Sequence, residues 1–235
     1  MPITQPTVFI SSTAPDLREH REAAARAARQ AGFHAVIMEE FEAQSALPPY
    51  AACMARVREC DVLVVLVAHR YGWAPPDQPG KDAKSITWLE CEEIRSAGRE
   101  LLAFVVEAKH TWPLQHKEAY RATEALEQGK LTGKLQKEIT RNVKKLGEFK
   151  AWLDSIGFRK TFTHPDSLNS LVQESLTKWK TRHQVTTKPV ADSGEYLRQL
   201  REHTRWIDIR GLQVGAVGEE IIGVKIRIVV TGPSG

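Results

Sequence analysis

Short apolar segments alternate with longer segments of helical periodicity over the first 108 residues. The apolar segments are residues 7–12, 33–39, 61–72 and 101–108, and helical patterns cover 15–32, 48–60 and 85–100. The run Val62–Val67 has no polar alternation, which is typical of a strand covered on both faces. Strands that alternate with helices predict right-handed crossovers and a parallel sheet. We therefore expect an α/β fold, an open flavodoxin-like three-layer sandwich, with further helices C-terminal to it.

The rest of the chain has fewer strand signals. Residues 115–183 predict two or three long helices, which large apolar side chains could dock onto the sheet. These anchors are Trp152, Phe158, Phe162 and Trp179. Residues 184–194 are short, polar and contain a proline, as in a linker. We expect one domain over residues 6–183, the linker over 184–194, and the start of a second module over 195–235.

Composition and charge narrow the class of protein. The formal charge is +4, and residues 109–160 carry twelve Lys/Arg against six Asp/Glu. That excess fits a solvated helical face or an anionic partner, but it lacks the aromatic interleaving of single-strand binders, so nucleic acid is not the expected partner. No signal peptide or membrane span is visible, and the three cysteines lack metal-ligand spacing. We expect a soluble cytoplasmic protein with reduced thiols.

The first candidate for chemistry is the junction between residues 7–12 and the helix that follows. Ser11, Ser12 and Thr13 stand there in a row, at the carboxyl edge where parallel sheets bind ligands. A helix that begins near Pro15 would offer unpaired N–H groups to phosphate or carboxylate. Thr13 and Asp16 also have the spacing of a capping arrangement. The hydroxyls therefore indicate a ligand cradle, and capping alone is the alternative.

The second candidate is the segment that follows the third strand. Arg70 and Tyr71 begin a loop and are expected at the rim of the pocket, Ser85 can cap the next helix, and Glu90 falls on its first turns. A carboxylate there could stabilise positive charge at a sugar C1 during cleavage of an N-glycosidic bond. The alternative is an acid favoured by the helix dipole. Trp73 and Trp88 could stack on a base or fill the core. The histidines form no zinc motif, so no metal site is expected.

These segments resemble a bacterial domain family of unknown function that usually precedes NACHT-type STAND NTPases. The similarity is carried by "VFISSTAPDLREHREAA", "GFHAVIMEEFEA", "CDVLVVLVAHRYGW" and "SITWLECEEIRSAG". It covers residues 6–108 closely and residues 109–183 loosely. The family is in turn similar to TIR domains, some of which cleave NAD, and to nucleoside 2-deoxyribosyltransferases.

The resemblance implies roles for several of the residues already singled out. Glu90 matches the catalytic acid, while Ser11, Ser12 and Asp16 match the opening motif. Trp88 stands where relatives often carry an additional acid. The implied function is an effector or signalling domain in antiphage defence that cleaves NAD or a related nucleotide when it is clustered. The alternative is a non-catalytic TIR-like module for self-association or effector recruitment.

The C-terminal residues resemble a different kind of module, a nucleotide-binding one. Tyr196–Leu212 looks like the lead-in to a NACHT module, and "RIVVTGPSG" looks like a strand and the first half of a Walker A loop. Gly232 would be the first glycine of that loop. We therefore expect an N-terminal piece of a longer protein, which would bind ATP and Mg²⁺ and self-associate through the NTPase module. No ATPase activity and no cofactor are expected of this piece alone.

Overall fold

The computed structural model describes residues 5–13, 16–37, 49–80, 82–157 and 159–183, all of them in one unit, Met1–Thr187. Four of the sequence-based expectations fall outside these residues. They concern the apolar anchor Phe158, the linker at 184–194, the module at 195–235 and its glycine, Gly232.

A five-stranded, all-parallel sheet forms the centre of the domain, in the order β2-β1-β3-β4-β5. The strands are β1 Thr7–Ser12, β2 His34–Ile37, β3 Val62–Val67, β4 Glu100–Val106 and β5 Arg159–Phe162. Every residue of β3 is buried, because β3 is the central strand and helices cover both of its faces. The prediction for this strand is thereby confirmed.

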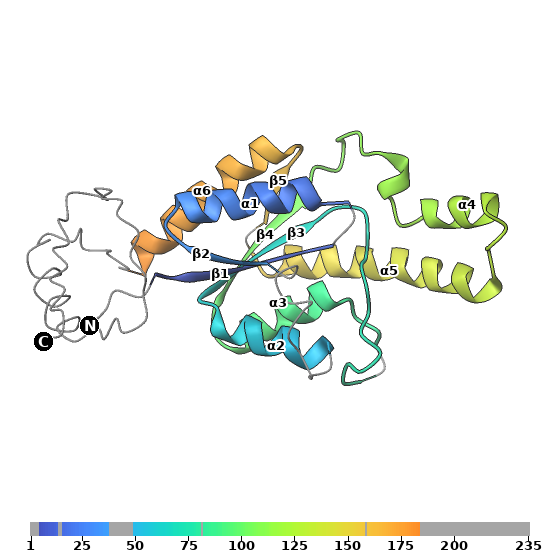
Figure 1. Ribbon diagram of the computed structural model, residues 1–235, viewed down its shortest axis with the longest axis horizontal. Coiled ribbons are helices and arrows are strands. Elements are labelled where there is room, and N and C mark those ends of the chain that lie inside the picture. Colours follow the sequence, from blue (N-terminus) through green and yellow to red (C-terminus); the bar gives the residue numbers. More distant parts are fainter. Residues whose placement is uncertain (1–4, 14–15, 38–48, 81, 158, 184–235) are drawn as a thin grey trace, which may run out of the picture. The chain divides into compact units, whose positions relative to one another are not determined.

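Helices cover both faces of the sheet (Figure 1). The helical elements are α1 Arg18–Gln30, α2 Pro49–Glu59, α3 Ile86–Ser96, the 3₁₀ turn η2 Leu114–His116, α4 Tyr120–Glu127, α5 Gly133–Ser155 and α6 Pro165–Arg182. In Figure 1, α1 and α6 lie on one face, and α2, α3 and α5 lie on the other. Helix α4 and the first turns of α5 extend beyond the carboxyl ends of the strands, where they can form part of a site.

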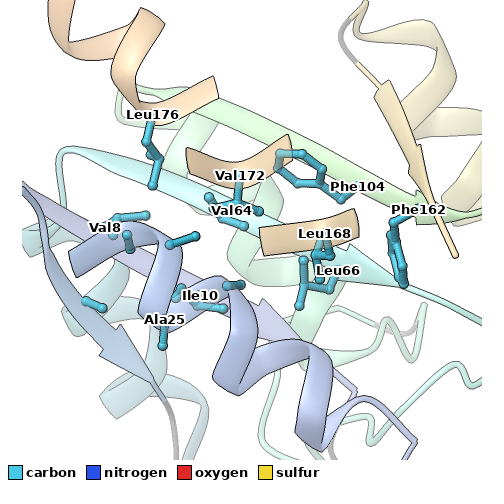
Figure 2. Close-up of a cluster of buried hydrophobic side chains, with 14 of the residues drawn as sticks. Val8, Ile10, Ala25, Val64, Leu66, Phe104, Phe162, Leu168, Val172 and Leu176 are labelled. Atoms are coloured by element: carbon cyan, nitrogen blue, oxygen red, sulfur yellow. The ribbon is translucent and has the colours of Figure 1, made fainter. Parts of the chain in front are cut away.

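The face under α1 and α6 carries the first of two apolar clusters (Figure 2). Alternate residues of β1 and β3, such as Ile10 and Val64, are buried on this face together with Val172 and Leu176 of α6. Alanines on the buried side of α1 allow this helix to lie close to the sheet and to α6. A hydrogen bond of 2.9 Å from Asn169 Nδ2 to the carbonyl of Ala23 joins the two helices.

The opposite face carries the second apolar cluster. Phe9 and Leu63 of the sheet are buried there together with Trp88 of α3 and Phe149 of α5. The Trp88 ring stacks on Phe149 with 5.1 Å between ring centroids. Trp88 is 6% exposed and therefore fills the core, which was one of its two predicted uses.

The strand β5 corrects the prediction of helices alone over residues 115–183. It has four residues, pairs with β4 at the edge of the sheet, and is preceded by Gly157. Of its residues only Phe162 is fully buried, because the others are charged or hydroxylated and partly face solvent. So short a segment gives no clear two-residue alternation, and its pairing with β4 is what makes it a strand.

The architecture is an α/β three-layer sandwich of the flavodoxin-like kind, as the sequence predicts. No helix among the residues that the structure describes is both long and apolar enough to cross a membrane. Cys60 and Cys91 are buried, Cys53 is half-buried, and all three are free thiols.

Candidate functional site

The candidate catalytic acid, Glu90, is hydrogen-bonded to Ser11 at the carboxyl end of β1. Ser11 is the penultimate residue of that strand, and Glu90 lies on the second turn of α3. The Ser11 hydroxyl donates to Glu90 Oε2, and both residues are about 1% exposed. Within the described part of the chain Glu90 Oε1 has no hydrogen-bond partner. The fold therefore brings together two residues that are 79 positions apart.

The surroundings of Glu90 favour its uncharged form. Burial raises the pKa of Glu90 from 4.5 to about 8, although the hydrogen bond from Ser11 acts in the opposite direction. None of the basic side chains that the structure describes forms an ion pair with this carboxyl group. A buried carboxyl with a strongly raised pKa is a common feature of acid–base and electrostatic catalysis.

The three hydroxyls at the end of β1 do not form one cradle. Successive residues of a strand face opposite sides of the sheet, so Ser11 meets α3 while Ser12 meets α1. The Ser12 hydroxyl accepts a 2.9 Å hydrogen bond from Arg21 Nη1. Thr13 donates from Oγ1 to Asp16 Oδ1 over 2.8 Å. The three hydroxyls thus have three different partners, Glu90, Arg21 and Asp16.

The capping role expected for Thr13 and Asp16 is also wrong. Helix α1 begins at Arg18, with Leu17 at its N-cap and no side-chain cap hydrogen bond. Thr13 lies too early in the chain to reach the first turn, and its hydroxyl is used by Asp16 instead. Burial raises the pKa of Asp16, while the hydrogen bond from Thr13 lowers it. The start of α1 therefore keeps N–H groups that no side chain caps.

Tyr71 corrects a second expectation. It was predicted at the rim of a pocket, but it is 1% exposed and joins the core beneath α3. Its hydroxyl accepts from the backbone N–H of Ser85 over 3.0 Å and donates to the carbonyl of Ala83 over 3.4 Å. Ser85 itself caps α3 by accepting from the backbone N–H of Trp88, as predicted. Tyr71 and Ser85 therefore set the position of the helix that carries Glu90.

Sequence reasoning missed Glu118, a buried acid just before α4. Its Oε1 accepts from Arg121 Nη1 over 2.6 Å and from Asn142 Nδ2 over 3.1 Å. Its Oε2 accepts from the backbone N–H of Tyr71 over 3.1 Å. Glu118 thus ties the loop after β3 to α4 and α5. No local pattern marks it, because its three partners lie on separate segments.

A cleft of about 540 Å³ opens at the carboxyl edge of the sheet, between the loop after β3 and helices α4 and α5. We call it the arginine cleft, and it is lined in part by Thr13, Arg70, Trp73 and Arg141. Arg70 donates to the carbonyl of Gln115 over 2.7 Å, and neither Arg70 nor Arg141 forms an ion pair with a described residue. Trp73 is 47% exposed there. Two such guanidinium groups beside an exposed indole suit a phosphate and a planar ring.

Gly72 explains how closely the two walls of the arginine cleft approach each other. Its φ of +87° lies in the left-handed region, and a Cβ at this position would lie 3.1 Å from Thr13 Cγ2. A side chain here would therefore strain the backbone and crowd Thr13. Gly72 thus keeps the loop after β3 against the end of β1.

The described residues contain no group of three or more His, Cys, Asp or Glu side chains arranged to hold a metal ion. The expectation of ATP and Mg²⁺ attaches to the module around Gly232, outside the described residues. The roles predicted for Glu90, Ser11, Ser12, Thr13, Asp16, Arg70, Tyr71 and Ser85 in binding or catalysis stay predictions.

Comparison with known proteins found a similar solved chain and a matching family model. A similar solved chain is described as "Structure of the activated Roq1 resistosome directly recognizing the pathogen effector XopQ (TIR domains)". The similarity covers 74% of this chain and 99% of that one, at 13% identity and a TM-score of 0.43. No curated protein matches the chain. A family model described as "Domain of unknown function (DUF4062)" matches residues 7–177. The chain therefore belongs to the DUF4062 family.

Proposed function

We propose that this domain is an effector or signalling domain that cleaves the N-glycosidic bond of NAD or a related nucleotide. The observation that carries the proposal is Glu90, a buried carboxyl hydrogen-bonded to Ser11 at the carboxyl edge of the sheet, with a pKa near 8. Such sheets bind their ligands at that edge. Glu90 has no basic partner among the described residues, so no ion pair competes with a substrate for the carboxylate once it ionises.

The chemistry that this carboxyl can support is hydrolysis at the ribose C1. The bond between C1 and the nicotinamide nitrogen breaks, and nicotinamide leaves with the bonding electron pair. Water then adds its oxygen to C1 and releases a proton. The transition state resembles an oxocarbenium ion, which an ionised Glu90 would stabilise. The positive charge of the bound nicotinamide ring would itself favour ionisation of Glu90.

The arginine cleft is the proposed route for the rest of the nucleotide. Arg70 and Arg141 would contact the pyrophosphate, and Trp73 would stack on a base. Thr13 lines this cleft and directly follows Ser12, the last residue of β1, two positions after Ser11. The cleft and the Ser11–Glu90 pair are thus neighbours at the end of a single strand.

Activation would require a conformational change, because Glu90 is 1% exposed. We propose that self-association through a STAND NTPase module, loaded with ATP and Mg²⁺ in a longer protein, clusters these domains. Clustering would open a path from the arginine cleft to Glu90. Antiphage defence is the proposed setting, since an enzyme that consumes NAD must stay inactive until it is triggered.

The proposal is tested by measuring nicotinamide release from NAD by the chain, free and fused to a tetramerising coiled coil. We expect release by the clustered protein and little by the free protein. The burial of Glu90 also fits a second function, a non-catalytic module for self-association in which Glu90 is structural. Absence of NAD loss in both forms, together with concentration-dependent self-association, would favour that module.

Arg141→Ala should raise the KM of the clustered protein for NAD at least about tenfold and leave kcat nearly unchanged. A charge-assisted hydrogen bond to phosphate contributes roughly 1.5–3 kcal/mol, and each 1.4 kcal/mol is a factor of ten. Steady-state kinetics measure the effect. Lys144→Ala is the matched control, because Lys144 is on the same helix but its side chain is 80% exposed and it does not line the cleft. Equal KM values for the two variants would remove Arg141 from the binding site.

A further inference from the structure

A second cavity lies at the same edge of the sheet, beside the first residues of α1 and α6. It holds about 480 Å³. Its lining includes Asp16, His20, His110, Trp112, His116 and His164. We call it the histidine cavity. Four imidazoles from three separate segments meet here because the segment after β4 crosses between the beginnings of α1 and α6.

Several polar groups in the walls of the histidine cavity lack partners among the described residues. His20 Nε2, Asp16 Oδ2 and Trp112 Nε1 make no hydrogen bond there. His20 is 9% exposed and Asp16 is 6% exposed. Buried polar groups are nearly always hydrogen-bonded in native proteins. His20 Nε2 and Trp112 Nε1 can each donate to an anion in the cavity, whereas Asp16 Oδ2 can donate to it only when the carboxyl is protonated.

The start of α1 adds a positive potential to the same place. Arg18, the first residue of this helix, lines the histidine cavity, and the helix has no side-chain cap. The N–H groups of its first turn and its dipole favour an anion. The N-terminus of α6 differs, because His164 Nδ1 accepts from the backbone N–H of Ser167 and caps it. The attraction for an anion therefore centres on α1.

The charged groups around the histidine cavity are balanced in a way that suits an anion. Asp16 and Glu19 are the acids in its lining, and Arg18, which also lines it, lies 3.4 Å from the carboxylate of Glu22. Burial raises the pKa of Asp16, which reduces its negative charge, whereas the hydrogen bond from Thr13 and the charges of Arg70 and His116 lower this pKa. Burial lowers the pKa of His20, and His110 and His164 lower it further. An anion would reverse that effect on the imidazoles.

We propose that the histidine cavity binds the phosphate group of a small phosphorylated molecule. The site is distinct from the Ser11–Glu90 pair, which lies on the α3 side of the sheet. The hydrogen bond between Thr13 and Asp16 joins a residue of the arginine cleft to a residue of the histidine cavity. The two sites thus meet at this hydrogen bond.

The first test uses sulfate alone, because it remains a dianion between pH 6 and 8 and any pH dependence then belongs to the protein. Histidine ring resonances are followed by NMR during a sulfate titration. We expect saturable shifts at His20, His110 and His116, with no saturable shift at His34 or His183, which do not line the cavity. If bound sulfate raises the pKa of one histidine by one unit, the protein binds sulfate about tenfold more tightly at a pH where that histidine is protonated than at a pH where it is neutral.

Two variants keep the test independent of folding. Arg18→Gln and His116→Gln change residues whose side chains are not fully buried, and each should weaken sulfate binding at least about fivefold. His34→Gln is the matched control and should leave the affinity unchanged. Shifts that fail to saturate, or that are as large at His34 as at His20, would overturn the proposal. These readouts do not depend on NAD cleavage.

The source of the phosphate is identified in a second arm, in which ribose 5-phosphate replaces sulfate and inorganic phosphate is the reference. At least tenfold tighter binding of ribose 5-phosphate than of inorganic phosphate supports a phosphorylated small molecule. Equal affinities would overturn that assignment and leave the free anion as the ligand.

Discussion

Replacing Glu90 with glutamine is expected to lower kcat for NAD cleavage by the clustered protein at least about 100-fold. Loss of one group that stabilises transition-state charge typically costs a factor of 10²–10³. Glutamine has nearly the same size as glutamate and can still accept the hydrogen bond from Ser11, so the change removes the ionisable group and little else. Nicotinamide release under saturating NAD measures the effect.

The control for this variant is Glu92→Gln. Glu92 lies on the same helix, two residues further, and its carboxylate accepts a 2.7 Å hydrogen bond from Lys84. It should retain nearly full activity. The kcat/KM of the unmodified protein should also rise with pH toward about 8, as Glu90 ionises. Unchanged turnover in Glu90→Gln, or an equal loss in both variants, would contradict the assignment of Glu90 as the catalytic residue.

The second large effect concerns the pH dependence of stability. The pKa of Glu90 is about 8 in the folded protein against 4.5 when exposed, so between these values the folded state binds a proton that the unfolded state has lost. Its contribution to the free energy of unfolding is therefore complete below pH 4.5 and declines as pH rises to 8. The total loss is on the order of 5 kcal/mol for a shift of this size.

His69 changes the free energy of unfolding in the opposite direction, and it does so at lower pH. Burial lowers the pKa of His69 from 6.5 to about 4, so its contribution is complete above pH 6.5 and is lost as pH falls toward 4. The contribution of Glu90 is therefore best separated from that of His69 between pH 6.5 and 8. Over this interval it lowers the free energy of unfolding by about 2 kcal/mol.

Urea unfolding of the unmodified protein and of Glu90→Gln at pH 6.5 and at pH 8 measures this contribution. The unmodified protein should lose about 2 kcal/mol more than the variant over that interval, because glutamine does not ionise. Parallel pH profiles would show that Glu90 is already ionised in the folded state at pH 6.5. They would also place its pKa outside the range useful for the proposed chemistry.

Much of the fold could be predicted because its signals are local. The strand Val62–Val67 is apolar throughout, and the alternation of strands with helices is enough to predict a parallel sheet. The strand Arg159–Phe162 could not be predicted, since only its pairing with β4 makes it a strand. The start of α1 was misplaced because Thr13 and Asp16 bond to each other rather than to the helix.

In the candidate site, too, features with a local sequence signal could be predicted, whereas features that depend on distant contacts could not. Ser11 and Glu90 could be expected near each other, because both belong to the carboxyl edge of a parallel sheet. Tyr71 was misplaced because its neighbours in the sequence look like an exposed loop, whereas Glu118 and Ser85 draw it into the core. No sequence motif marks the histidine cavity, because His20, His110 and His164 are far apart in the chain.

The packing of α6 against α1 has a consequence for biosynthesis. Helix α6 completes the apolar face over β1, β3 and β4, but it is the last of these elements to leave the ribosome. At 5–20 residues per second, the interval between the end of β4 and the end of α6 is on the order of 4–15 s. During that time the nascent sheet exposes Ile10, Val64 and Phe104 on one side. Until α6 has emerged, this apolar face of the nascent domain is a binding surface for a chaperone on the ribosome.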